Sequence, residues 1–501
     1  MKRIINFRPI AFAAVGAIVG AVISSYYPAL GFFAFIIVGV LGLIYPIIVK
    51  LLCFDTPFSK IILSDLLFFF VILLSFLRVY DYVDGALRSA VKEGEYTVEG
   101  VVVEKSISGK EARVRLSDCV CNGENTGDIY FYSLSGVSLY DTVSVRCNLK
   151  PIDPTDDEGF RYSYLALKGV SYISFGKASA YITGKSQDPF AKIKLFVDSV
   201  FAVEEEENGG VITALFTGDT EYFDAETLNA YRFGGIAHVF AVSGMHVGML
   251  YVALGFILRR KKGKRMIKCA IISIALIAYS GVCGFSASSM RAAITFTALC
   301  ISEALGEKGD HLTALSLACI IVCFLFPSEI FGIGFALSFL ISLALILLAP
   351  PLKREMAFGE KISDVLSGTL SAQIAALPIS VNSFGFFPIV GILTNILLVP
   401  IVSIVYYMLW VAFIISAIIP VIRPIALFLP NILITGIDGI TTFLSSFKLS
   451  VDIMPPALAF AYYGGAIVYS DGVNASKAAK RAAFASIPLC FAVCAVFSAI
   501  M

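Results

Sequence analysis

The sequence predicts a polytopic α-helical membrane protein with a small all-β domain inserted between its spans. The chain is 58% hydrophobic and only 15% charged over 501 residues, whereas a soluble domain has about a quarter of its residues charged. Apolar runs of about 20 residues recur along most of it, which is the length that crosses a bilayer. One long polar segment, from Asp81 to about Asp198, interrupts them.

Three apolar runs precede the polar segment and ten follow it, which predicts about 13 membrane spans. The first run carries no small-residue cleavage site and two more runs follow closely, so we expect an uncleaved span. The run at 389–419 is long enough to hide a re-entrant break. The runs lie at about 9–26, 29–49, 61–80, 236–258, 266–284, 287–305, 311–327, 330–350, 365–382, 389–419, 424–446, 455–470 and 483–500.

Basic residues orient the predicted spans, because Lys and Arg concentrate in cytoplasmic loops. Lys2, Arg3 and Arg8 place the N-terminus in the cytoplasm, and three spans then place residues 81–198 outside the cell. The next span should run inward, and it ends at the most basic run of the chain, Arg259–Arg265. The alternating direction of the spans therefore agrees with the positions of the basic loops.

The outer segment reads as five to seven short strands separated by Gly, Asn and Asp turns, as in "EYTVEGVVVEK" and "DTVSVRCNL". This number of short strands in one small domain favours an OB-like closed barrel. Residues 91–185 hold 11 Lys/Arg against 13 Asp/Glu, which is not the charge of a nucleic-acid binder. Cys147 has two alternatives of equal weight: a disulfide with Cys119 or Cys121, or three free thiols.

Two of the three histidines, His238 and His246, flank Ser243 in "GGIAHVFAVSGMHVGML". Ser243 and His246 share a helical face, but no acid follows to orient a base, so a serine hydrolase is a weak reading. The two histidines are eight residues apart with no third ligand nearby, so no metal site is expected. Gly244 lies four residues before Gly248, a spacing typical of close helix packing in membranes.

Three further polar residues lie at predicted membrane depth. Arg291, in "GFSASSMRAAITF", marks either a transport pathway or a side chain that reaches the outer interface. Gln373 and Asn395 lie in spans that contain Pro378 and Pro400. Such interrupted spans indicate a transport path, although amides also hydrogen-bond between helices.

Energy-coupling and metallohydrolase motifs do not occur in the sequence. It contains no G-x-x-x-x-G-K-[ST] run and no H-E-x-x-H cluster. We therefore expect neither an ATPase nor a nuclease, and no cofactor.

The quoted histidine stretch closely resembles the hallmark of the ComEC competence family, the inner-membrane DNA channel of natural transformation. The upstream segment "ALFTGDTEYFD" and the downstream segments "SSMRAAI", "FGIGFALSFLISLALI" and "AQIAALPISVNSFGFFPIVGILTNILLVPIV" are similar to further family blocks in the same order. "DEGFRYSYLALKGVSYIS" resembles the end of the family's OB-like domain. His238, Ser243, Gly244 and His246 match the hallmark by position, and Arg291, Gln373 and Asn395 match later blocks.

The resemblance implies passage of single-stranded DNA across the bacterial cytoplasmic membrane. Many family members carry a C-terminal metallo-β-lactamase-like domain, so this chain is expected to be a short form. The implied partners are a cytoplasmic helicase-type ATPase, an envelope DNA receptor, a separate nuclease and membrane lipids. A transporter or flippase for another anionic envelope polymer or lipid is the alternative, and a membrane-embedded serine hydrolase is the second.

The expected organisation has four parts. Residues 1–80 form three N-terminal spans and residues 81–190 form the extracytoplasmic OB-like domain. Amphipathic connecting helices occupy 191–235, and residues 236–501 form a competence-type transmembrane bundle.

Overall fold

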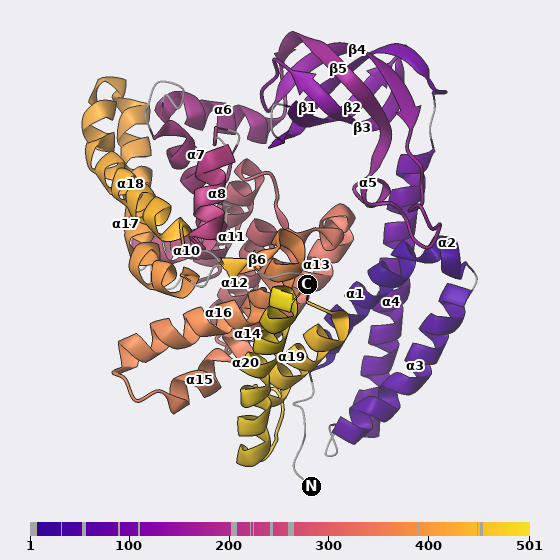
Figure 1. Ribbon diagram of the computed structural model, residues 1–501, viewed down its shortest axis with the longest axis vertical. Helices are drawn as coiled ribbons and strands as arrows, with labels where there is room; N and C mark the ends of the chain where they lie inside the picture. The colour runs from indigo at the N-terminus through magenta and orange to yellow at the C-terminus, as the bar shows by residue number, and fades with distance from the viewer. Residues whose placement is uncertain are drawn as a thin grey trace.

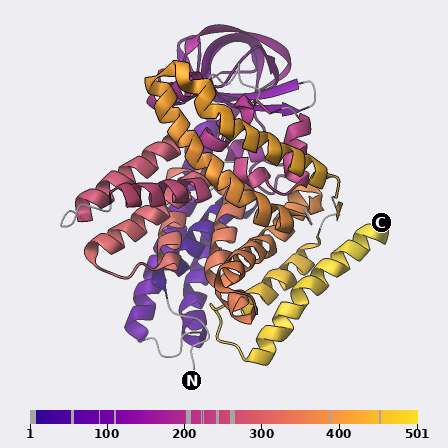
Figure 2. The same cartoon turned by 90° about the vertical axis from the view of Figure 1, so that its left-hand side faces the viewer.

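A β-barrel lies at one end of the molecule and helices make up the rest (Figures 1 and 2). The structure is a computed structural model. It describes residues 8–31, 33–52, 57–88, 91–108, 111–201, 208–220, 222–223, 225–240, 244–258, 265–387, 390–447, 449–450 and 454–500.

Five strands close into the barrel in the order β1-β2-β3-β5-β4. Neighbouring strands run antiparallel, except that β3 and β5 are parallel. The predicted small closed barrel is thus confirmed as a five-stranded mixed barrel. Its strands are β1 (Gly94–Ser108), β2 (Glu111–Cys121), β3 (Glu124–Ser135), β4 (Asp141–Pro151) and β5 (Val170–Lys185).

Alternation of side chains builds the barrel core. Along β4, Val143, Val145, Cys147 and Leu149 are buried while the residues between them are more exposed. Successive side chains of a strand point to opposite faces, so every second residue reaches the interior. The pattern that predicted the strands is therefore the pattern that fills the core.

Of the two alternatives for Cys147, the structure has the free thiols: Cys119, Cys121 and Cys147 are unbonded and buried in the barrel core. Strand β1 lies between β2 and β4, so the two cysteine-bearing strands are two strand spacings, about 9–10 Å, apart. A disulfide needs α carbons within about 7 Å. Burial raises the pKa of the Cys147 thiol to about 11.

The N-terminal helices pack against one side of the bundle, where α1 and α4 share a core with α13 and α14, and α4 reaches up to the barrel (Figure 1). Gly20 lets α1 approach α4 closely, since a Cβ there would overlap the carbonyl of Ile72. The hydroxyl of Ser75 donates across the same contact to the carbonyl of Ala17, at 2.7 Å. These helices are α1 (Pro9–Ser25), α2 (Tyr27–Leu30), α3 (Phe33–Leu52) and α4 (Phe58–Leu87).

Short helices connect the barrel to a large helical bundle. The connecting helices are α6 (Pro189–Phe201), α7 (Gly209–Thr217), α8 (Ala225–Phe233) and α9 (Ala237–Phe240), whereas α5 (Tyr164–Leu167) lies between β4 and β5. The bundle contains α10 (Gly244–Ile257), α11 (Arg265–Val282), α12 (Ala287–Leu305), α13 (His311–Leu325), η1 (Pro327–Phe331), α14 (Ile333–Leu347), α15 (Ala349–Glu355), α16 (Glu360–Phe384), β6 (Phe386–Phe387), α17 (Gly391–Ile418), η2 (Pro420–Ile422), α18 (Arg423–Ser445), β7 (Leu449–Ser450), α19 (Pro456–Tyr469) and α20 (Lys477–Ile500).

Within the described residues, five helices are long and apolar enough to cross a membrane, or six if α14 and α15, bent by 43°, form one span. These helices indicate a multi-pass membrane protein. The number of about 13 stays a prediction, because several apolar runs fold as helices of 14 to 17 residues, such as α10 and α13. In the described part of the run at 389–419, no break occurs between Gly391 and Ile418, which form the continuous helix α17.

Two sets of contacts fix the barrel to the helices. On one side the hydroxyl of Tyr82 on α4 donates to the carbonyl of Lys168, at 3.0 Å. The ammonium of Lys168 lies 3.8 Å from the carboxylate of Glu329 on η1. On the other side, α6 places the ammonium of Lys194 5.0 Å from the ring centre of Tyr140, just before β4. The barrel is therefore held at both sides of its base.

Candidate functional site

The histidine-bearing stretch forms the end of α8, the short helix α9 and the start of α10. Gly235 has a φ of +79°, a left-handed conformation that favours glycine. This conformation lets the N–H of Ile236 donate to the carbonyl of Tyr231, at 3.0 Å. The bond caps the C-terminus of α8. Ser243 lies outside the described residues, and α10 begins directly after it at Gly244.

Gly244 and Gly248 of α10 face a neighbouring helix, as their spacing predicted, and that helix is α12. A Cβ at Gly244 would overlap Nη2 of Arg291. A Cβ at Gly248 would lie 3.2 Å from Cζ of Phe296, one turn further along α12. Gly244 therefore makes room for the guanidinium of Arg291 at the N-terminus of α10.

Arg291 points into the bundle, toward α14. Its Nη1 donates to the hydroxyl of Ser342, and that hydroxyl donates in turn to the carbonyl of Ser338, at 2.8 Å. The hydroxyl of Ser338 bonds to Ser288 on α12, at 3.1 Å. A line of serine hydroxyls thus runs between α12 and α14 beside the guanidinium.

The charge of Arg291 has no acidic partner among the described residues. Their ion pairs do not include Arg291, and its Nε is buried without a hydrogen bond. A serine hydroxyl carries no charge, so it does not neutralise a guanidinium. A cation in a membrane bundle is costly, and this one is left without a counterion.

His246 lies on the other side of α10, two residues and therefore about 200° from Gly244. Its side chain is fully buried, and its ring meets Tyr406 of α17 edge to face with ring centres 4.8 Å apart. The hydroxyl of Tyr406 donates to the carbonyl of His246, at 3.4 Å. Arg291 and His246 consequently belong to different contacts of α10.

The side chain of His238 has an exposed surface, whereas most of its neighbours are buried. It lies on α9 and is exposed, while Ile236, Val239 and Phe240 are buried. The structure does not join His238 to Arg291 by a hydrogen bond within the described residues. The hallmark histidines therefore differ: one is accessible and the other is a core side chain.

Gln373 and Asn395 are partly buried, on α16 and α17. The Oδ1 of Asn395 is buried without a hydrogen-bond partner. No hydrogen bond of the described residues joins either amide to Arg291 or His246. The described family-matched residues thus lie on five helices, α9, α10, α12, α16 and α17. Among them, Gly244 and Arg291 are in direct contact.

Pro378 interrupts the hydrogen bonding of α16, and the interruption is repaired locally. A proline in a helix frees the carbonyl four residues earlier. The hydroxyl of Tyr462 donates to the carbonyl of Ile374 and that of Tyr463 to the carbonyl of Ala375, both at 3.0 Å. Backbone groups in a membrane need such partners, so α19 stabilises this point of α16.

Two features of the site were not predicted from the sequence. The first is the serine pair of α14, Ser338 and Ser342, whose four-residue spacing in an apolar run was the available signal. The second is a buried ion pair between Lys194 on α6 and Asp219 after α7, whose side chains are each 6% exposed. Asp219 belongs to the "ALFTGDT" segment, but nothing local pointed to its partner.

Metal binding has no support in the part of the chain that the structure describes, where no three His, Cys, Asp or Glu side chains gather as ligands would.

Comparison with known proteins gives the family. The family model for competence proteins matches residues 215–470, which include α8 to α18 and all the residues considered above from His238 to Asn395. The chain belongs to the competence protein family. It is 30% identical over 194 residues to ComE operon protein 3 of Bacillus subtilis (strain 168), an alignment that covers 39% of this chain and 25% of that protein.

The match with this relative thus spans about a quarter of its length. No solved structure matches this competence-family chain significantly.

Proposed function

We propose that the bundle forms a path for single-stranded DNA across the cytoplasmic membrane during natural transformation. The family match, which implies a role in DNA uptake, supports a nucleic-acid substrate. The observation that carries the proposal is Arg291, a cation inside the bundle with no acidic partner among the described residues.

Phosphodiester groups suit this position. A guanidinium binds phosphate oxygens through two parallel hydrogen bonds. The N-terminus of α10, which begins at Gly244 beside Arg291, adds free N–H groups and a partial positive charge. A passing phosphate would supply the negative charge that the protein itself does not place there. The Ser338–Ser342 line would offer further polar contacts.

The remaining parts of the proposal follow from the sequence. The N-terminus is cytoplasmic, about 13 spans cross the membrane, and the barrel, with an OB-like role, lies outside. His238, Ser243, Gln373 and Asn395 contribute to the path. A separate helicase-type ATPase drives transport, and a separate receptor and nuclease deliver the single strand, so the chain itself acts without catalysis.

The test is entry of single-stranded DNA into liposomes that contain the purified protein, under a membrane potential. The readout is DNA protected from added nuclease. Wild-type protein is expected to admit DNA, with the cytoplasmic helicase partner added if entry needs a motor. Arg291→Ala is expected to reduce protected DNA about tenfold or more, because it removes a charge-assisted contact worth about 1.5–3 kcal/mol.

A control variant separates transport from folding. Gly334→Ala on α14 adds a methyl group where nothing lies within 4 Å, so we expect it to insert normally and to retain most uptake. No entry by wild-type protein with the helicase present would favour the alternative, a transporter or flippase for another anionic polymer or lipid. A serine hydrolase has less support, since the imidazole of His246 is fully buried against Tyr406.

A further inference from the structure

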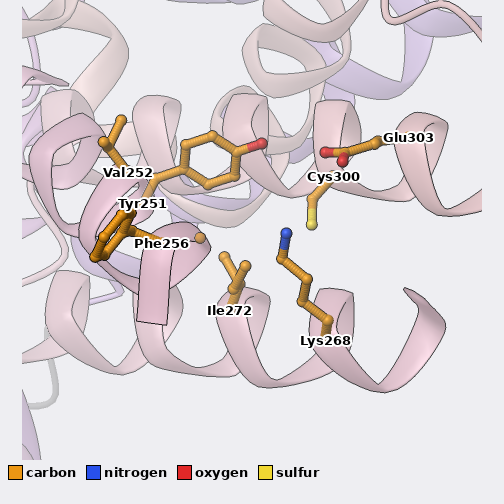
Figure 3. A pocket seen from close by; sticks show the side chains of 8 residues that line it. Tyr251, Val252, Phe256, Lys268, Ile272, Cys300 and Glu303 are labelled. Atoms are coloured by element: carbon orange, nitrogen blue, oxygen red, sulfur yellow. The ribbon is translucent and has the colours of Figure 1, made fainter. Parts of the chain in front are cut away.

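A pocket of about 360 Å³ lies between α10, α11 and α12 (Figure 3). It is separate from the Arg291 contact, which lies at the opposite end of α10. Pockets of about 300–1,000 Å³ are typical for small ligands, so this one is near the lower limit. Its walls and its floor differ in chemistry.

The walls are apolar and open outward. Val252 and Phe256 of α10 are 62% and 74% exposed, and Ile272 of α11 lies across from them. On a helix of a membrane protein, exposed side chains of this kind face acyl chains. The pocket therefore opens toward the lipid.

The floor, at the buried thiol of Cys300, carries a positive group and, at its exposed edge, a negative one. Figure 3 shows the ammonium of Lys268 and the hydroxyl of Tyr251 near Cys300, with the carboxylate of Glu303 beside that thiol. The ion pairs of the described residues include neither Lys268 nor Glu303. Two opposite charges thus line one apolar-walled pocket without neutralising each other.

The floor lies at the depth of a headgroup. Lys268 is in the first turn of α11 and Glu303 in the last turn of α12, so each is within about 5 Å of a helix end. Tyrosine also favours the membrane interface. This end of the bundle adjoins the basic run 259–265, which predicts the cytoplasmic leaflet.

We propose that this pocket binds the headgroup of a phospholipid that carries both a phosphate and a primary amine. The phosphate lies on Lys268 and the hydroxyl of Tyr251, and the ammonium of the lipid lies on Glu303. The acyl chains follow Val252 and Phe256 into the bilayer. A headgroup with negative charge alone would satisfy Lys268 but leave Glu303 facing an anion, so the paired charges select the zwitterion.

The test is lipid retention by the full chain in native mass spectrometry. The probes are phosphatidylethanolamine and phosphatidylglycerol with identical acyl chains, titrated separately. Wild-type protein is expected to retain phosphatidylethanolamine about tenfold more tightly. Glu303→Gln should remove that preference by weakening only phosphatidylethanolamine, whereas Lys268→Met should weaken both lipids.

Two neighbouring residues provide matched controls. Glu307 and Lys308 are exposed just beyond α12 and do not line the pocket, so Glu307→Gln and Lys308→Met should leave both affinities unchanged. Each variant must elute as wild type from a sizing column. Equal retention of the two lipids by wild type, or an undiminished preference in Glu303→Gln, would overturn the proposal.

Discussion

Two cations of this protein, Lys194 and Arg291, lie in regions that treat charge in opposite ways. At the base of the barrel, Lys194 is paired with Asp219 and lies against the ring of Tyr140. Burial alone would lower the pKa of Lys194. The opposite effect of Asp219 and Tyr140 is larger, so the pKa lies above its ordinary value. In the bundle, Arg291 has a serine hydroxyl and no carboxylate among the described residues.

In our proposal Lys194 is a structural charge and Arg291 a functional one. A buried pair that satisfies itself fixes two elements relative to each other, here α6 and the segment after α7. A buried cation without a counterion forms no ion pair that could fix two elements, and its burial costs free energy. Proteins keep such costs at functional sites, which is why we assign the anionic substrate to Arg291 and not to Lys194.

The largest effect on stability is expected for Lys194→Met. This change removes the ammonium that faces the buried carboxylate of Asp219, and breaking a buried pair from one side costs about 3–5 kcal/mol. Thermal unfolding of the purified protein should show a large drop. The double variant Lys194→Met with Asp219→Leu should recover most of it, and a double variant as unstable as the single one would refute a pairwise role.

Gly244→Ala is expected to have the next largest effect. The added methyl group would overlap Nη2 of Arg291, the far end of a flexible side chain that can shift, so the cost should be about 1 kcal/mol, the low end for overpacking. DNA uptake should fall as well, since Arg291 must move. Gly334→Ala on α14, where a Cβ meets nothing within 4 Å, is the matched control, and an equal loss in both variants would argue against the Gly244–Arg291 contact.

A pH-dependent effect is expected in the barrel at Asp128. Burial raises its pKa to about 6, although Arg115, 3.7 Å away, lowers it. An acid with a raised pKa in the folded state destabilises that state once it ionises, so wild-type stability should rise as the pH falls from 7 toward 4. Asp128→Asn should therefore stabilise the protein by about 1 kcal/mol at pH 7.5.

The measurement is the unfolding temperature of the full chain at pH 7.5 and pH 4.5. The gain from Asp128→Asn should be present at the higher pH and nearly absent at the lower one. A gain of equal size at both values would show that ionisation of Asp128 is not its cause.

The smallest effect on stability is expected for Arg291→Met. Removing a buried charge that lacks a counterion should leave the unfolding temperature unchanged or slightly raised. A loss comparable to that of Lys194→Met would show that Arg291 is a structural residue and would erase the difference between the two regions.

Local patterns were sufficient for much of the fold. Alternation along segments such as Asp141–Pro151 identified the strands, and the length of apolar runs identified a multi-pass helical protein. The number of spans could not be confirmed, because apolar length alone does not say where a helix such as α10 begins. The sequence could not decide between a disulfide and free thiols at Cys147, because the strand order, which places β1 between β2 and β4, depends on long-range pairing.

The site was predicted by residue type but not by arrangement. The spacing of Gly244 and Gly248 indicated a helix contact, and the structure shows Arg291 and Phe296 there. The different surroundings of His246 and His238 depend on which helices pack against α10 and α9. Ser342 and Lys194 were missed for the same reason, since their partners are 51 and 25 residues away in the sequence.

The central claim, that Arg291 meets the charge of the transported polymer, is tested most directly by varying both charges together. Liposome entry would be measured for a phosphodiester strand and for a strand of the same sequence with a neutral methylphosphonate backbone, using wild-type protein, Arg291→Lys and Arg291→Gln. We predict that the phosphodiester strand enters best with arginine, less with lysine and about tenfold less with glutamine, while entry of the neutral strand does not depend on residue 291. Equal sensitivity of both strands to Arg291→Gln would contradict the claim.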